Sequence, residues 1–179
     1  MPASLAAVSG AGTNLLITVD DVRDPEVVAF LEAHVTQMRS ISPPESVHAL
    51  DVEALRGPAI TFFVARDAET GELLGTAALK ALADDAAPEG GHLELKSMRT
   101  APHRRGEGLG AAVLVHVLAH ARAAGAARVS LETGAEDFFA PARALYLRHG
   151  FVVTEPFADY RPDPLSVFLT LDLALRHGG

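Results

Sequence analysis

The chain has 179 residues, a length typical of one domain, with the ordinary globular composition of 49% hydrophobic and 21% charged residues. It contains no cysteine, which excludes a disulfide scaffold, a thiolate nucleophile, a cysteine-based zinc site and an iron–sulfur cluster. Its net charge of −8 argues against nucleic acid as a partner, because nucleic-acid-binding domains usually carry a basic face.

Hydrophobic periodicity and Gly/Pro punctuation predict strands and helices in alternating groups. Residues 1–13 are small and Gly/Ser/Ala-rich, which predicts a flexible N-terminus without the charged start of a signal peptide. The predicted elements are a strand at Leu15–Val19, a helix from Asp24 to about Met38, a second helix after Ser42–Glu45 with Val47, Leu50 and Leu55 as its apolar residues, strands at Ile60–Ala65 and Leu73–Leu82, a polar loop at Asp84–Gly91, a strand at His92–Thr100, a helix at Gly106–Ala124, a strand at Arg128–Thr133, a helix at Pro141–His149, and strands at Phe151–Thr154 and Ser166–Leu173.

This order predicts a mixed α/β fold in which helices pack around one sheet. It differs from a doubly wound fold, which alternates strand and helix throughout. We expect one domain over 14–175 with a short tail at 176–179. The apolar run over 110–119 is far shorter than the roughly 20 residues of a membrane span, so we expect a cytoplasmic protein with no membrane partner.

The most informative stretch is a glycine-rich turn between a strand and the long helix, with Gly106, Gly108 and Gly110. Amide groups at a helix start lack helical partners, and the helix dipole adds positive charge, so such a turn can bind a phosphate or pyrophosphate. Residues 96–105 contain five basic or titratable side chains and no acid: Lys96, Arg99, His103, Arg104 and Arg105. A merely tight strand-to-helix connection remains the alternative. The spacing of these glycines fits neither the phosphate-binding loop of NTPases nor the glycine fingerprint of dinucleotide-binding folds.

Two motifs carry a resemblance to a known family. Arg105–Gly110 resembles the R/Q-x-x-G-x-G signature of the GNAT superfamily of acyl-CoA-dependent N-acetyltransferases, and Ala142–Phe151 resembles its A-x-x-L-Y-x-x-x-G-F motif. The stretches at 42–50, 131–134 and 163–168 further resemble the bacterial YsnE-like branch. The resemblance implies a GNAT fold with a mostly antiparallel central sheet, flanking helices, and a splayed pair formed by the strands at 92–100 and 128–133.

The resemblance also implies which residues bind acetyl-CoA. The turn amides would bind its pyrophosphate, and the preceding strand would pair with its pantetheine arm. The implied cofactor-binding residues are Met98, Arg99, Thr100, Arg104, Arg105, Gly106, Glu107, Gly108, Leu109, Gly110, Ala111, Phe139 and Ala142. Phe139 stands where many members have an orienting Asn, so it is expected to pack on the pantetheine or in the core.

For catalysis, the resemblance implies Tyr146 as the group that protonates the departing sulfur and Glu94 as the base that deprotonates the amine. Tyr146 could instead be a core residue, and Glu94 could lie on a solvated strand face while water takes the proton. His48, Glu132 and Tyr160 are the candidate substrate-binding residues, with structural roles as their alternatives.

The resulting hypothesis is an acetyl-CoA-dependent N-acetyltransferase that transfers the acetyl group directly to a primary amine in a ternary complex. The acceptor would be a small molecule or a terminal amino group. The resemblance to this family is also compatible with a homodimer. The rival hypothesis is an inactive acyl-CoA-binding or sensor domain. No metal is expected, since His116 and His120 lack the Glu of a H-E-x-x-H motif. The net charge weakly favours a cationic acceptor but selects no substrate.

Overall fold

The computed structural model describes residues 6–10, 12–48, 51–83 and 89–174. Within these ranges, eight strands form one sheet in the order β1-β2-β3-β4-β5-β6-β8-β7, in which β5 and β6 are parallel and the other neighbours antiparallel. The strands are β1 (Ala6–Gly10), β2 (Thr13–Asp20), β3 (Ile60–Asp67), β4 (Leu73–Ala81), β5 (His92–Thr100), β6 (Arg128–Gly134), β7 (Val152–Thr154) and β8 (Ser166–Asp172). The helices are α1 (Pro25–Ile41), α2 (Val52–Leu55), α3 (Leu109–Ala123) and α4 (Ala140–Arg148), with 3₁₀ turns η1 (Pro44–Ser46), η2 (Pro102–Arg104) and η3 (Asp137–Phe139).

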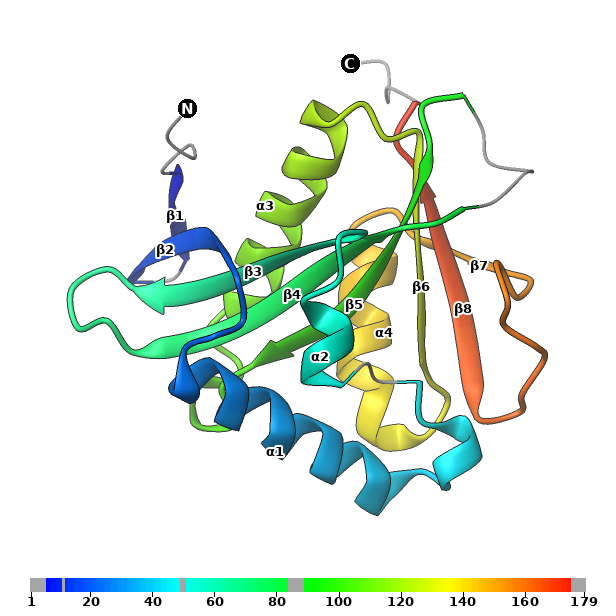
Figure 1. Ribbon diagram of the computed structural model, residues 1–179, viewed down its shortest axis with the longest axis horizontal. Coiled ribbons are helices and arrows are strands. Elements are labelled where there is room, and N and C mark those ends of the chain that lie inside the picture. The colour runs from blue at the N-terminus through cyan, green and yellow to red at the C-terminus, as the bar shows by residue number, and fades with distance from the viewer. Residues whose placement is uncertain (1–5, 11, 49–50, 84–88, 175–179) are drawn as a thin grey trace.

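Helices cover both faces of the sheet (Figure 1). Successive side chains of a strand point to opposite faces, and β3 follows this rule with four buried residues. Phe63 and Ala65 pack in the core beneath α3, whereas Phe62 and Val64 pack in a second core beneath α1 and α2. Burial of each large apolar side chain contributes about 1.5–3 kcal/mol, so the strand binds helices on both sides.

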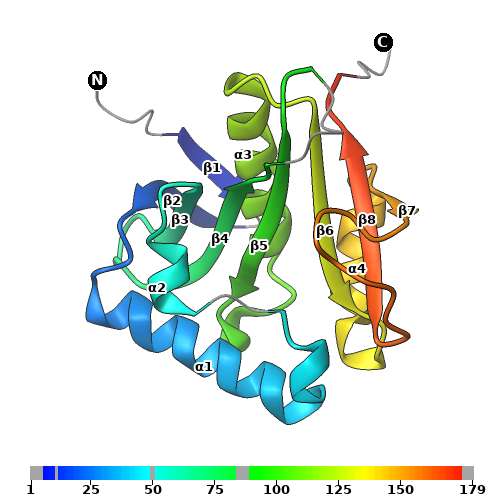
Figure 2. The same cartoon turned by 45° about the vertical axis from the view of Figure 1, so that its right-hand side comes forward.

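The parallel pair of β5 and β6 opens toward its C-terminal ends. The register pairs only His92–Glu94 with Arg128–Ser130, although both strands continue beyond these residues. On its other edge, β5 carries an irregularity opposite Thr76–Ala78, and Ser97 adopts a left-handed φ of 50° there. One extra residue in a strand bends it and changes which side chains share a face. Figure 2 shows the two strands diverging, as the resemblance implies.

The predicted strands and most helices are confirmed, with three differences. The first is β1, which pairs with β2 in a segment where the sequence predicts no strand. The second is the predicted helix after Ser42–Glu45, which is replaced by the two short pieces η1 and α2. Leu50, residues 84–88 of the predicted loop and the tail 176–179 lie outside the described residues.

The third difference is the start of the long helix α3, which begins at Leu109 and not at Gly106. Gly106 and Gly108 have φ angles of 82° and 77°, in the left-handed region where a right-handed helix is impossible and where glycine avoids steric strain. Among the described helices, none is long and apolar enough to cross a membrane.

Candidate active site

A cleft of about 760 Å³ lies where β5 and β6 separate. Its walls come from α1, residues 42–48, β5, the glycine turn, the end of β6 and the start of α4. Most of the predicted site residues line it: His48, Glu94, Met98, Arg99, Thr100, Arg104, Arg105, Gly106, Gly108, Leu109, Gly110, Ala111, Glu132, Phe139, Ala142 and Tyr146. Glu107 and Tyr160 do not line it, but each binds a residue that does.

The glycine turn presents open backbone amides to the cleft. Among the described residues no side chain caps the start of α3 at Gly108, so the first N–H groups of the helix have no capping partner there. Gly110 allows α4 to approach, because a Cβ there would lie 3.3 Å from Leu145 Cδ2. These features fit an anionic group at the helix start, and they favour a binding turn over a mere connection.

The basic residues around this turn do not form one patch. Arg104 donates to both carboxylate oxygens of Glu107 at 2.9 and 2.8 Å, to Glu72 at 3.0 Å and to Thr13 at 3.0 Å. Its guanidinium therefore braces the turn, although the residue borders the cleft. Arg105 lies with its guanidinium carbon 5.7 Å from the Phe138 ring centre and has no carboxylate partner among the described residues.

Glu94 is held in a buried cluster at the other end of the cleft. Its Oε1 accepts hydrogen bonds from the Tyr160 hydroxyl and, at 3.1 Å, from Lys96 Nζ, which also donates to the Tyr160 oxygen at 2.9 Å. The side chains of Glu94 and Lys96 are only 4% and 8% exposed. Burial and the charge of Glu94 raise the pKa of Tyr160, so its hydroxyl stays protonated and donates.

Glu132 occupies the end of β6 across the same cleft. Burial raises the pKa of its carboxyl from 4.5 to about 7, against the lowering effect of Lys96, while the charges of Glu94 and Asp163 raise it further. A carboxyl group that titrates near neutrality can take up a proton from a substrate at working pH. The sequence indicated Glu132 only as a binding contact.

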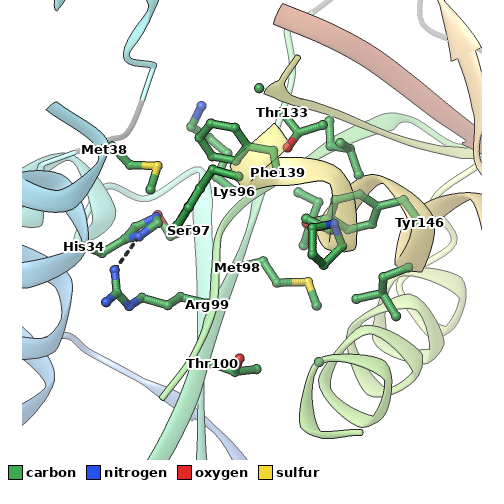
Figure 3. A pocket seen from close by; sticks show the side chains of 18 of the residues that line it. His34, Met38, Lys96, Ser97, Met98, Arg99, Thr100, Thr133, Phe139 and Tyr146 are labelled. Carbon is green, nitrogen blue, oxygen red and sulfur yellow. Dashed lines mark hydrogen bonds between the residues drawn. The ribbon is translucent and has the colours of Figure 1, made fainter. Parts of the chain in front are cut away.

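Tyr146 lies on α4 at the inner side of the cleft and is 7% exposed. Burial, with a further effect from the charge of Glu132, raises the pKa of its hydroxyl, which therefore keeps its proton at neutral pH. Its ring packs edge-on against Phe151, with ring centres 5.7 Å apart. In Figure 3, Tyr146 lies across the cleft from Arg99 and His34.

Aromatic contacts shape the two remaining walls. The edge of one ring faces the other in the pair His48–Tyr160, with centres 5.0 Å apart, and Tyr160 in turn contacts Phe168 at 5.4 Å. Phe139 packs directly on the backbone of Gly134, where any Cβ would overlap the ring. Phe139 therefore forms a wall of the cleft, in the position where the sequence left its role open.

The structure also adds residues that the sequence did not indicate. His34 and Met38 line the cleft from α1, one helical turn apart, and Arg99 Nη1 lies 2.8 Å from His34 Nδ1. Their only sequence signal is a spacing of four on a predicted helix, which is not specific. His116 and His120, by contrast, face the Phe63 ring at 6.0 and 5.0 Å, far along α3 from the turn.

A sheet whose parallel strands separate beside a helix with an uncapped, glycine-rich start is the architecture of an acyltransferase that uses acyl-CoA. The acetyltransferase (GNAT) family matches residues 27–151, and the chain belongs to this family. It is an acyltransferase with the GNAT fold, as the two motifs predicted.

Similar proteins agree with this assignment. The chain is 46% identical over 157 residues to the uncharacterized N-acetyltransferase YedL of Escherichia coli K12, covering 88% of this chain and 94% of YedL. It is 45% identical over 157 residues to the uncharacterized N-acetyltransferase YsnE of Bacillus subtilis 168, covering 88% of this chain and 99% of YsnE. A crystal structure assigned as an acyl-CoA N-acyltransferase from Klebsiella pneumoniae superposes with a TM-score of 0.68 at 29% identity, covering 89% and 97% of the two chains.

Proposed function

We propose that the protein transfers an acetyl group from acetyl-CoA directly to a primary amine, on a small molecule or a terminal amino group, in a ternary complex. The observation that carries the proposal is the two-ended cleft between β5 and β6. One end of the cleft offers the open amides of α3 and Arg105. The other end, called the acceptor end below, offers Glu94 and Glu132, and Tyr146 also lines the cleft. An anionic donor and an amine can therefore bind together, and their proximity supplies much of the rate enhancement.

Acetyl-CoA, when bound, supplies the acetyl thioester. The amides of Leu109, Gly110 and Ala111, together with Arg105, would hold its pyrophosphate, and the edge of β5 at Met98–Thr100 would pair with its pantetheine arm. The residue types present fit an anionic group, because uncapped N–H groups converge on one turn with an arginine that no carboxylate pairs in the described part of the chain.

An amine must lose a proton to attack a thioester, and we assign Glu132 to take it. The resemblance implies Glu94 in this role, but Tyr160 and Lys96 already occupy an oxygen of that carboxylate. Glu132 has a pKa of about 7, which suits transfer near neutral pH. Glu94 then keeps Lys96 and Tyr160 in place, and the two carboxylates make the acceptor end attractive to an ammonium group.

Tyr146 is the proton donor of the proposal. As the carbon–sulfur bond breaks, the sulfur gains negative charge, and a hydroxyl that donates to it makes the thiolate a better leaving group. The raised pKa of Tyr146 keeps the proton available until that moment. No covalent enzyme intermediate is needed, in accordance with a chain that has no cysteine.

The experiment combines titration calorimetry with acetyl-CoA and a thiol-release assay over a panel of amines. Binding of acetyl-CoA with release of CoA thiol that depends on an amine supports the proposal. Binding without release in any amine would favour the rival sensor domain, and absence of binding would contradict both hypotheses. Mass spectrometry of the product then identifies the acetylated nitrogen.

A further inference from the structure

Arg99 is a cleft residue whose charge the described part of the chain does not balance. It projects from β5 toward α1, where Nη1 lies 2.8 Å from His34 Nδ1 and the guanidinium carbon lies 5.5 Å from the Phe30 ring centre. Neither contact is with a carboxylate, and no acidic side chain pairs with Arg99 among the described residues. The other cation of the acceptor end, Lys96, is paired with Glu94.

His34 binds Arg99 without neutralising it. An arginine side chain has only donors, so His34 Nδ1 must accept the hydrogen bond and its ring proton must be on Nε2. Burial, with the nearby charge of Arg99, lowers the pKa of His34 to about 4, so the ring is neutral at working pH. The pair therefore keeps one full positive charge, held in place by α1.

A donor of Arg99 also lacks a partner. Its Nε–H is buried and donates to no acceptor among the described residues. A buried donor left without an acceptor destabilises the folded chain. Such a group fits a ligand that brings an acceptor oxygen, and a carboxylate matches the planar donor geometry of a guanidinium.

The irregularity in β5 places Arg99 on the acceptor side. The side chains of Met98 and Thr100 meet Gly110 of α3, with nearest atoms 4.0 and 3.7 Å from the position of a Cβ there, whereas Arg99 contacts α1. Figure 3 shows Arg99 and His34 together on the α1 side of β5, away from Tyr146. The side chain therefore faces away from α3, whose uncapped start would hold the pyrophosphate.

We propose that Arg99 binds a carboxylate of the acceptor, so that the acceptor is an amine that also carries a carboxylate group, such as an amino acid. This inference rests on the proposed function. The carboxylate would lie against Arg99 near α1, and the amine would lie at the Glu94–Glu132 end. The charges along the cleft are thus complementary to both charged groups of an amino acid, whereas the net charge of the chain favoured only a cationic acceptor. His34 is a positioning residue for Arg99.

The test is a thiol-release panel of matched acceptors. It contains the common L-amino acids, β-alanine and 4-aminobutyrate, each beside its carboxamide and its decarboxylated amine, together with polyamines and peptide N-termini. We expect the carboxylate form to have a kcat/KM about 10²-fold above both partners, the effect of a desolvated charged hydrogen bond. Turnover of polyamines alone, or equal turnover of carboxylate and carboxamide, would overturn the inference and leave the proposed function standing. Failure of every amine would contradict both.

Variants of Arg99 separate acceptor binding from cofactor binding. Arg99→Gln should raise the KM for the carboxylate acceptor about 10²-fold, with a smaller change in kcat and none in the Kd of acetyl-CoA. Arg99→Lys, which keeps the charge without the planar fork, should restore part of the loss. Arg122→Gln, at an exposed position of α3 outside the cleft, is the matched control.

Arg105 is near enough to affect the pKa of Arg99, so a joint role in phosphate binding is the competing outcome. A weaker Kd for acetyl-CoA in Arg99→Gln would establish that outcome and overturn the inference.

Discussion

The hydroxyl group of Tyr160 donates a hydrogen bond to the carboxylate of Glu94, 66 residues away in the sequence. The loop between β7 and β8 is thereby joined to β5 at the point where β5 and β6 begin to separate. Lys96 completes the cluster from the same strand. A change in this cluster should therefore affect the acceptor end of the cleft and leave the glycine turn intact.

Tyr160→Phe tests this separation. The substitution removes one donor to Glu94 and one acceptor of Lys96, both buried, so the free energy of unfolding should fall by about 1–3 kcal/mol. The KM for the acceptor should rise while the Kd of acetyl-CoA stays unchanged. Urea unfolding, steady-state kinetics and titration calorimetry measure these three quantities. A parallel loss of acetyl-CoA affinity would show that the cluster supports the whole cleft.

The base assignment predicts different pH profiles for two glutamine variants. The activity of the wild type should rise with pH through about 7, because Glu132 must be ionised to accept a proton. Glu132→Gln should lower kcat/KM about 10²-fold and remove this limb. Glu94→Gln should retain it, at reduced activity, because Lys96 loses its charge partner. The opposite pattern would assign the base to Glu94, as the resemblance implies.

Glu132 also predicts how stability depends on pH. Its folded pKa of about 7 lies above the ordinary 4.5, so between these values the folded chain binds more protons than the unfolded chain. The stabilisation is complete below pH 4.5 and is lost as pH rises through 7. Glu132→Gln should therefore gain stability relative to wild type from pH 4.5 to 8, by on the order of 3 kcal/mol. The exposed variant Glu155→Gln should show no such trend in thermal unfolding.

The two motifs allowed the glycine turn and the helix α4 to be predicted because their signals are local. Glycine at 106 and 108 is required by the left-handed backbone itself, and such a requirement is visible in one short stretch. Tyr146 follows from its place in the second motif. The strand β3 could be predicted from a continuous apolar run between Gly57–Pro58 and the turn at 67–71, and such a run is typical of a strand whose two faces are both buried.

The sequence indicated residues of the acceptor end, such as Glu94, Glu132 and Tyr160, but their contacts could not be predicted in this way because they join distant segments. The left-handed backbone of Ser97 is a non-glycine exception that no composition rule indicates, yet it accompanies the irregularity after which Arg99 faces α1. The pairing of Lys96 with Glu94 and Tyr160 likewise needs the β7–β8 loop in place. The strand β1 was missed because small residues and glycine carry little strand propensity.

Arg104 is hydrogen-bonded within the protein, whereas Arg105 contacts the Phe138 ring and, among the described residues, no carboxylate, so substitutions at these neighbouring arginines should have different effects. Arg105→Gln should weaken acetyl-CoA binding by about 10- to 10²-fold, since a charged hydrogen bond to phosphate is worth about 1.5–3 kcal/mol, and should leave stability unchanged. Arg104→Gln should chiefly lower stability, because Glu72, Glu107 and Thr13 lose a shared partner. Calorimetry and urea unfolding on both variants measure the contrast. Equal loss of affinity in both would assign Arg104 a direct contact with the phosphates.

Tyr146→Phe tests the proton donor, since it removes one oxygen from a ring that otherwise keeps its packing against Phe151. We expect kcat to fall about 10²-fold, the typical contribution of general acid catalysis, with little change in the Kd of acetyl-CoA. The loss should shrink when the leaving thiol is replaced by a more acidic one, because a better leaving group needs less protonation. Single-turnover kinetics with acetyl-CoA and an activated acetyl thioester measure both quantities. An unchanged single-turnover rate would remove Tyr146 from the chemical step, and equal losses with both thioesters would mean that the hydroxyl serves positioning instead of proton transfer.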